Sequence, residues 1–376
     1  MRGQIVDIST DGRGVIRDGK TVFIKDALPG DLVEYFLVNE KKNYDEAEVK
    51  EFIQYSDKRK FTDNPLGSAY PLYPLYEDYQ LELKKNMVDF NIKRKAGIEL
   101  DVKAVASDDY KLNKIRLHVN RDKIGLHSRG TNDIYLPDLE TLFGHREFIE
   151  NLPKDLKNAT YVSLRQADNG LFLATDGQYF GKDIDGVEDI NGHKGTLPII
   201  EIEGIKYAHD IDGFFQNSKS GAAHALKIIG DQARGEVLDL YCGVGFISLY
   251  VGKNAQALTG VEINSSAINH AKDNAKLNEI KNAKFICKDT ADYMRSNKKE
   301  YDTIIIDPPR SGLHKDVIAG IVKTCKKELV YMSCDLGTFT RDLKILKDHF
   351  EVEEIYVIDM FKGTSGVECI GKMTRK

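Results

Sequence analysis

The sequence lacks tryptophan, has only five cysteines in 376 residues, and contains no long apolar run. The odd cysteine count, without any C-x-x-C pair, argues against a disulfide framework and against a zinc ribbon. No stretch approaches the roughly 20 apolar residues that a membrane-spanning helix needs. The first residues, MRGQIVDISTDGRG, lack the apolar segment of a signal peptide. These absences predict a reduced, cytoplasmic protein with no membrane partner.

The charge balance is slightly acidic, with a formal net charge of −5. Domains that bind nucleic acid are often strongly basic, so any such surface here must be a local patch. Three sets of basic residues qualify, which are Arg13, Arg17, Lys20 and Lys25 in residues 1–55, the cluster Lys58–Lys60 and the cluster Lys93–Lys95. A cluster such as the last usually marks a solvated helix end, and the alternative for all three is a solvated surface.

The length and the turn signals divide the chain into three predicted domains. Residues 1–55 hold about five short alternating strands, which predicts a small OB-like barrel; the pattern leaves open whether it binds nucleic acid or only docks a partner. Residues 56–210 combine a polar linker and one helix with a central, mostly antiparallel β domain. Strands alternate with helices in residues 211–376, which predicts an α/β domain with a Rossmann-like sheet. We expect seven strands in that sheet, with an antiparallel hairpin at one edge.

A candidate cofactor pocket begins at Val237–Gly245, VLDLYCGVG, an apolar strand followed by a glycine turn and a helix. Gly243 and Gly245 allow the backbone to turn sharply and to approach a ligand closely. Glu262 ends the next strand, where a carboxylate can bind ribose hydroxyls. Ser248 replaces the third glycine of a dinucleotide fingerprint. The pattern therefore favours S-adenosylmethionine, which has no phosphates, and a dinucleotide-dependent oxidoreductase is the alternative.

Three residues carry reactive groups near the ends of later predicted strands. Asp307 begins the rigid sequence Asp-Pro-Pro-Arg, and Cys334 ends the strand LVYMSC just before a helix, whose dipole favours the thiolate. Glu368 lies in the last hairpin. A thiolate that adds to carbon 6 of a uracil ring makes carbon 5 nucleophilic, and a base must then remove the proton from carbon 5. Cys334 fits the first role and Glu368 the second, while the other four cysteines are expected to be buried hydrophobic residues.

The order of these motifs resembles that of the RNA uridine-5-methyltransferase family. The resemblance rests on DLYCGVG, DPPR, SCD followed by T-x-x-RDL, and VECI, together with FFQN at 214–217 and NKIRLHV at 113–119. It implies a class I methyltransferase domain, a TRAM domain at residues 1–55, S-adenosylmethionine as cofactor and RNA as substrate. It also implies roles for six residues: Cys334 as nucleophile, Glu368 as base, and Gln216, Tyr241, Glu262 and Asp307 in cofactor binding or the shared pocket.

Three departures from the family pattern bear on function. Many rRNA-modifying members hold a four-iron four-sulfur cluster through four cysteines, but no cysteine precedes Cys242 here. We therefore expect no iron–sulfur cluster and no other metal. Phe246 stands where the family often has a polar residue, and the hairpin FKGTSGVE lacks the usual Pro-His.

The sequence says less about which class of RNA is the substrate than about the reaction. A TRAM domain favours 23S rRNA, because the dedicated tRNA enzymes usually lack it, whereas the missing cluster favours the thymine-loop uridine of tRNA. We place rRNA first and expect residues 1–55 to serve RNA affinity more than the maximal rate. A non-catalytic RNA-binding protein is the alternative from another class, and a monomer is assumed.

Overall fold

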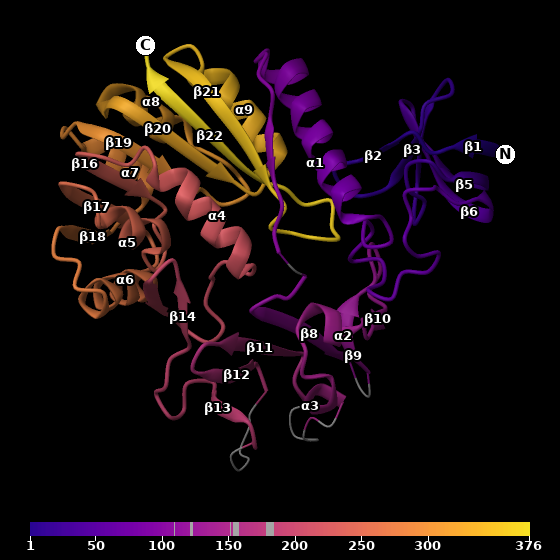
Figure 1. Cartoon of the computed structure of the whole chain (residues 1–376), viewed down its shortest axis with the longest axis horizontal. Helices are drawn as coiled ribbons and strands as arrows, with labels where there is room; N and C mark the ends of the chain where they lie inside the picture. The colour runs from indigo at the N-terminus through magenta and orange to yellow at the C-terminus, as the bar shows by residue number, and fades with distance from the viewer. Residues whose placement is uncertain (109, 121–122, 151, 153–157, 178–183) are drawn as a thin grey trace.

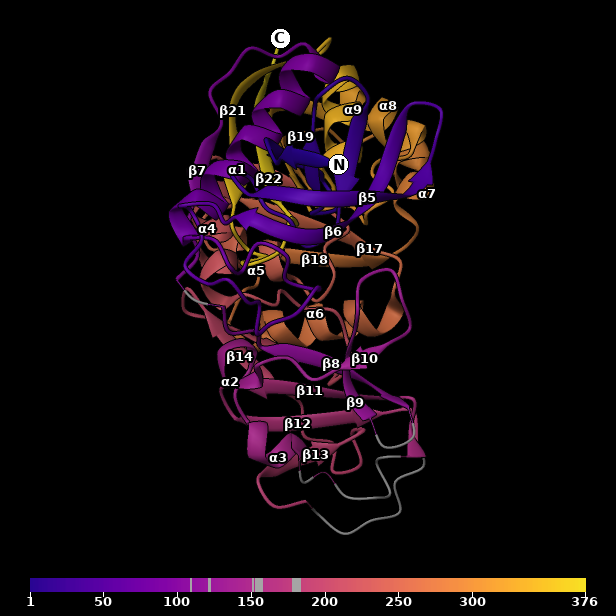
Figure 2. The same cartoon turned by 90° about the vertical axis from the view of Figure 1, so that its right-hand side faces the viewer.

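The computed structural model describes residues 1–108, 110–120, 123–150, 152, 158–177 and 184–376. The chain forms three lobes, which are an N-terminal β domain, a central β domain and a larger α/β domain (Figure 1). The central domain lies below the other two in both views (Figure 2). Within the described ranges, no helix has the length and apolar character needed to cross a bilayer.

The N-terminal domain is a six-stranded sheet with the strand order β1-β5-β6-β4-β3-β2, one strand more than the sequence predicted. Buried side chains alternate with more exposed ones along its strands, as in β4, where Val22 and Ile24 are buried. These buried residues form a small hydrophobic core within the domain. The strands are β1 (Arg2–Gln4), β2 (Asp7–Ile8), β3 (Gly14–Ile16), β4 (Thr21–Ile24), β5 (Leu32–Glu40) and β6 (Tyr44–Gln54).

The central domain is a second six-stranded sheet, with the order β10-β9-β8-β11-β12-β13. Its neighbouring strands pair antiparallel, except β12 and β13, which are parallel. Its elements are β8 (Lys114–Asn120), β9 (Lys123–His127), β10 (Ile134–Tyr135), α2 (Leu139–Leu142), α3 (Arg146–Glu150), β11 (Tyr161–Ala167), β12 (Gly170–Thr175) and β13 (Val187–Ile190).

The α/β domain is built on a sheet with the order β18-β17-β16-β19-β20-β22-β21-β7. Side chains of one strand enter two different cores, since Val237 packs in one cluster and Leu238 in the other. The strands of a sheet that is covered on both faces have nearly continuous apolar sequences, as in Ile304–Ile306. Its strands are β7 (Lys103–Val105), β16 (Glu236–Leu240), β17 (Ala257–Glu262), β18 (Ala283–Cys287), β19 (Tyr301–Ile306), β20 (Cys325–Ser333), β21 (Phe350–Ile358) and β22 (Glu368–Arg375).

Helices cover both faces of this sheet. Residues of the three helices between 219 and 277 pack in one apolar cluster, and residues of the three helices between 290 and 346 pack in the other. Side chains cap several of them, such as Asn264, which accepts from the amide of Ala267 at the start of α6. The helices are α4 (Lys219–Gly230), α5 (Phe246–Gly252), α6 (Ser265–Leu277), α7 (Thr290–Ser296), α8 (Lys315–Thr324) and α9 (Leu336–Leu346).

The expectation of seven strands with an antiparallel hairpin at the edge was wrong in two details. The sheet has eight strands, and the antiparallel strand β22 lies inside it, between β20 and β21. The added strand β7 pairs parallel with β21, with Lys103 opposite Tyr356, and so covers the edge that β21 would otherwise leave free. A strand of three residues has too little alternation to be recognised in a sequence.

The expected boundaries of the central domain also differ from the structure. Helix α1 (Glu77–Asn91) and the π-helical turn η1 (Ile92–Ala96) pack on the α/β domain, and the hairpin β14 (Ile199–Ile202) and β15 (Ile205–Ala208) belongs to its core. Figure 1 shows α1 between the α/β sheet and the N-terminal domain. The buried Lys84 amine donates to the Asp359 carboxylate at 2.5 Å and ties α1 to the end of β21.

Candidate active site

The glycine turn after β16 has the shape of a ligand cradle. Tyr241, Gly243 and Gly245 have φ angles of 66°, 54° and 89°, so the chain reverses sharply before α5 begins at Phe246. A Cβ added at Gly243 would have no neighbour within 4 Å, so the space above the turn is open. The Glu262 carboxylate lies beside it and accepts from the amides of Gly243, at 3.4 Å, and Asn264, at 2.8 Å. Tyr241 and Glu262 therefore meet at this turn, as predicted.

Gln216 reaches the same region from outside the sheet. The Asn113 side chain donates to the Gln216 carbonyl at 2.5 Å, and the Asn113 amide donates to the Asn217 carbonyl at 2.9 Å. The neighbouring Phe215 packs edge-on against Phe246 of α5, with ring centroids 5.8 Å apart. The two motifs FFQN and NKIRLHV thus contact one another, and together they hold Gln216, which is 7% exposed, close to the start of α5.

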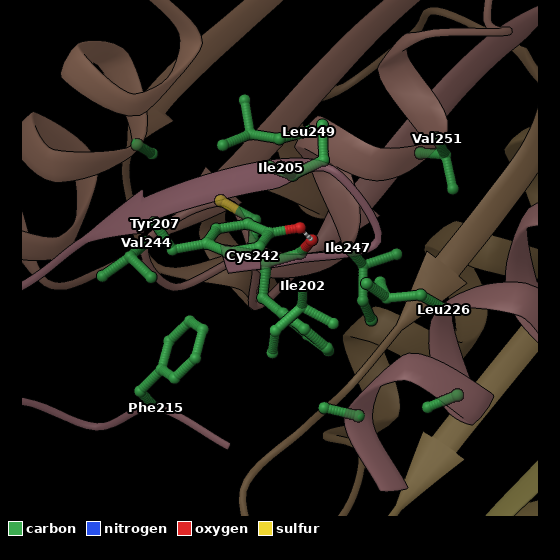
Figure 3. Packing of buried hydrophobic residues seen from close by; sticks show 14 of the residues in the cluster. Ile202, Ile205, Tyr207, Phe215, Leu226, Cys242, Val244, Ile247, Leu249 and Val251 are labelled. Atoms are coloured by element: carbon green, nitrogen blue, oxygen red, sulfur yellow. Dashed lines mark hydrogen bonds between the residues drawn. The ribbon is translucent and has the colours of Figure 1, made fainter. Parts of the chain in front are cut away.

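Phe246 itself belongs to the hydrophobic core. It is 7% exposed, and its carbonyl accepts from the Tyr207 hydroxyl at 2.9 Å. Figure 3 shows Tyr207 and Phe215 in this packing, next to Cys242 and Val244. Phe246 therefore packs in the core directly after the glycine turn and supports that turn.

Cys334 lies in the wall of a cleft of about 740 Å³ where the three domains meet. It follows β20 directly, and the next residue, Asp335, caps α9 by accepting from the Thr338 amide at 2.8 Å. Arg129 of the central domain and Asp11 of the N-terminal domain line the same cleft. A volume of this size is typical of sites that bind small molecules or a single nucleotide.

Strand register brings the two predicted catalytic groups together. In the antiparallel pair β20 and β22, Ser333 lies opposite Cys369 at the end of the ladder, and Cys334 and Glu368 adjoin this last pair at the same end. Asp307 follows β19, the other neighbour of β20, and its amide donates to the Leu240 carbonyl at 3.4 Å. The predicted nucleophile, the predicted base and the Asp-Pro-Pro-Arg motif thus lie at the same edge of the sheet.

Both carboxyl groups at this edge have raised pKa values. Glu368 is 3% exposed, and its Oε1 atom has no hydrogen-bond partner within the described part of the chain. Burial, together with the negative charge of Asp307, raises the pKa of Glu368 well above its usual value. Burial and the charge of Asp239 likewise raise the pKa of Asp307. Perturbed pairs of this kind are typical of catalytic sites.

Other groups around Cys334 act against the thiolate that the helix dipole is expected to favour. Burial raises the pKa of Cys334, and the charges of Glu368 and Asp307 raise it further. Arg310 acts in the opposite direction, because its guanidinium donates a hydrogen bond to the thiol. Arg310 belongs to the recognised motif DPPR, but sequence reasoning gave its side chain no role.

The remaining cysteines follow the prediction with one exception. Cys242, Cys325 and Cys369 are buried, whereas Cys287 is exposed at the end of β18. Across the described residues, no three His, Cys, Asp or Glu side chains are grouped so that they could hold a metal ion. Aromatic and aliphatic side chains fill the segment where the cluster cysteines of the family were sought, with Leu66 and Tyr73 buried against Leu142.

Comparisons with known proteins find similarity to RNA methyltransferases. Residues 200–376 match the family model for tRNA (Uracil-5-)-methyltransferase. A tRNA (uracil(54)-C(5))-methyltransferase of Pyrococcus abyssi is 28% identical over 422 residues, which cover 99% of this chain and 100% of that protein. An uncharacterized RNA methyltransferase of Mycoplasma mobile is 28% identical over 98% of this chain and 96% of its own length.

Two further similarities differ in extent. An uncharacterized RNA methyltransferase of Clostridium acetobutylicum is 37% identical over 177 residues, so the match spans 46% of this chain and 39% of that protein. The crystal structure of the Pyrococcus abyssi tRNA (uracil-54, C5)-methyltransferase in complex with S-adenosyl-L-homocysteine superposes with a TM-score of 0.80 at 25% identity, and it covers 99% of this chain and 100% of its own.

Proposed function

We propose that this chain, which belongs to the RNA uracil-5-methyltransferase family and depends on S-adenosylmethionine, methylates carbon 5 of a uridine through a covalent adduct between Cys334 and carbon 6 of the base. The register that brings Glu368 next to Cys334, which lines the cleft, carries this proposal. Family membership also removes the two alternatives, a dinucleotide-dependent oxidoreductase and a non-catalytic RNA-binding protein.

The cofactor fits the residues at the glycine turn. The open space above Gly243 and the carboxylate of Glu262 suit a ribose with two free hydroxyls, and Tyr241 and Gln216 border the same turn. When bound, S-adenosylmethionine supplies the methyl group. We assign Gln216, Tyr241, Glu262 and Asp307 to cofactor binding or to the shared pocket.

The chain's own residues account for the remaining steps. The Cys334 sulfur adds to carbon 6, and the electron pair of the carbon 5–carbon 6 double bond moves into the ring as an enolate. After carbon 5 has been methylated, Glu368 removes its proton, the double bond re-forms, and the thiolate leaves. A raised pKa suits Glu368 for this role, because a carboxylate with a raised pKa holds the acquired proton more tightly.

The sequence prediction and the comparisons favour different RNA classes. The preference for 23S rRNA rested on the N-terminal domain. The Pyrococcus abyssi relative, named for uracil 54 of tRNA, matches 99% of this chain, so its similarity includes most of that domain. This match weakens the argument for rRNA, and we propose tRNA as the first substrate to test. Mapping 5-methyluridine in tRNA and 23S rRNA from a deletion strain decides between them.

Release of tritium from RNA that carries 5-tritiated uridine tests the reaction. We expect release by the wild-type protein with S-adenosylmethionine, none by Cys334→Ala, and full release by Cys287→Ala, which removes an exposed thiol that does not line the cleft. Release at the wild-type rate by Cys334→Ala would contradict the proposed mechanism.

A further inference from the structure

The N-terminal domain contacts the loop that leads into Glu368. The Ser365 hydroxyl, in the loop 361–367, donates to the Thr10 carbonyl at 3.0 Å. Thr10 lies in the turn Ser9–Arg13, which we name the docking turn. Thr10 and Asp11 of this turn and Thr364–Val367 of the loop line the same cleft as Cys334.

The two halves of the loop 361–367 are held by different parts of the chain. Its first half is fixed by the linker and α1, because the Gly363 carbonyl accepts from the Leu72 amide at 2.9 Å and the Gly363 amide donates to Gln80 Oε1 at 3.0 Å. Its second half, from Ser365 to the start of β22, meets the docking turn. The segment nearest to Glu368 is therefore the one that the N-terminal domain supports.

The docking turn has a fixed shape that suits this contact. The Ser9 carbonyl accepts from the Gly12 amide at 2.7 Å, and Ser9 Oγ accepts from the Arg13 amide at 2.9 Å. Asp11 forms an ion pair with Arg129 of the central domain at 3.5 Å. The turn is thus folded by its own bonds and joined to a second domain as well as to the loop.

Gly12 is the point of closest approach. Its φ of +78° favours glycine. A Cβ at this position would lie 2.7 Å from the Pro71 ring, 2.9 Å from Arg129 Nη1 and 3.2 Å from Ser365 Oγ. The ring of Pro71 is rigid, so any side chain at residue 12 must move the turn away from the linker and the loop.

We infer that the docking turn is a positioning element for Glu368, so that the N-terminal domain sets the maximal rate of the reaction as well as the affinity for RNA. The inference rests on the proposed role of Glu368 as base. The sequence had predicted that residues 1–55 serve mainly RNA affinity. The contact between Thr10 and Ser365 instead couples them to the residue that must reach the carbon 5 proton.

Gly12→Ala tests this inference, and Gly19→Ala is its matched control. Gly19 lies in the same domain with a φ of +79°, and an added Cβ there would have no neighbour within 4 Å. Both variants carry the same backbone strain, but only the first disturbs the docking turn. We expect Gly12→Ala to lower the maximal rate at saturating RNA by about 10-fold or more, since a displacement of about 1 Å can cost about 100-fold. Gly19→Ala should keep the wild-type maximal rate.

A second readout does not depend on catalysis. Amide hydrogen exchange over residues 361–367 should be faster in Gly12→Ala than in Gly19→Ala. Ser365→Ala, which removes the hydroxyl and adds no bulk, should also exchange faster there and lower the maximal rate.

Two results would overturn the inference. One is equal exchange and equal maximal rates in Gly12→Ala and Gly19→Ala. The other is a Gly12→Ala variant in which only the Michaelis constant for RNA rises. If the wild-type protein formed no 5-methyluridine, the proposed function would fail, while hydrogen exchange would still decide whether the turn orders the loop.

Discussion

Replacing Glu368 by Gln is expected to stabilise the folded protein at neutral pH. The carboxyl group is 3% exposed and close to Asp307, and its pKa lies well above the usual 4.5. A carboxyl group whose pKa is raised by folding contributes its full stability below the unfolded pKa. This contribution is lost as the pH rises towards the folded pKa, because the unfolded chain ionises and the folded chain does not. Gln does not ionise in either state, so Glu368→Gln removes this loss.

The size of the effect follows from the two ionisation states. One pH unit between the unfolded and the folded pKa costs about 1.4 kcal/mol. With an unfolded pKa of 4.5, the stability gained by Glu368→Gln should grow between about pH 5 and about pH 7, by at most about 2.5 kcal/mol, which is the limit for a carboxyl group that stays protonated in the folded chain. Comparing the same variant at two pH values cancels the cost of burying an amide in place of a carboxyl group.

Urea unfolding of the wild type and the variant at both pH values measures this difference. Glu351→Gln is the control, since Glu351 lies at the other end of the α/β sheet with a side chain that is 70% exposed, and its gain should be near zero at both pH values. An equal gain for Glu368→Gln at the two pH values would refute the idea that folding raises the pKa of Glu368.

Three further outcomes follow from the site. Arg310→Ala should shift the pH profile of Cys334 alkylation by iodoacetamide to higher pH, because the guanidinium that lowers the thiol pKa is lost; an unchanged profile, read by mass spectrometry, would remove Arg310 from the site. Glu262→Ala should weaken binding of S-adenosylhomocysteine at least about tenfold in titration calorimetry, since a charged hydrogen-bond acceptor contributes about 1.5–3 kcal/mol. Protein purified without oxygen should contain no stoichiometric iron or sulfide, because residues 56–90 contain no thiolate to hold a cluster.

The placement of several site residues could be predicted from the sequence because these residues lie at the ends of strands. Cys334 follows β20 and Glu262 ends β17, and in an open parallel sheet these ends meet at one edge. The meeting of Cys334 and Glu368 needed one more feature, the antiparallel pairing of β22 with β20. The hairpin was recognisable from FKGTSG, but its place inside the sheet was not.

Other features depend on tertiary contacts that no local pattern records. Strand β7 has three residues and exists because β21 offers it an edge. The pKa of Cys334 is raised because burial and two carboxyl groups outweigh Arg310. The docking turn reads as an ordinary Asp-Gly turn in sequence, and its contact with Ser365 joins residues more than 350 positions apart. Contacts between domains are therefore the features that could not be predicted from the sequence.

The covalent adduct tests the central claim most directly. Glu368→Gln, incubated with substrate RNA and S-adenosylmethionine, should accumulate a protein–RNA complex that survives denaturing electrophoresis, because addition and methylation proceed while elimination stalls. Mass spectrometry should place a 5-methyluridine adduct on Cys334, and the double variant Cys334→Ala, Glu368→Gln should form none. A Glu368→Gln protein that turns over like the wild type, or an adduct that persists in the double variant, would contradict the account.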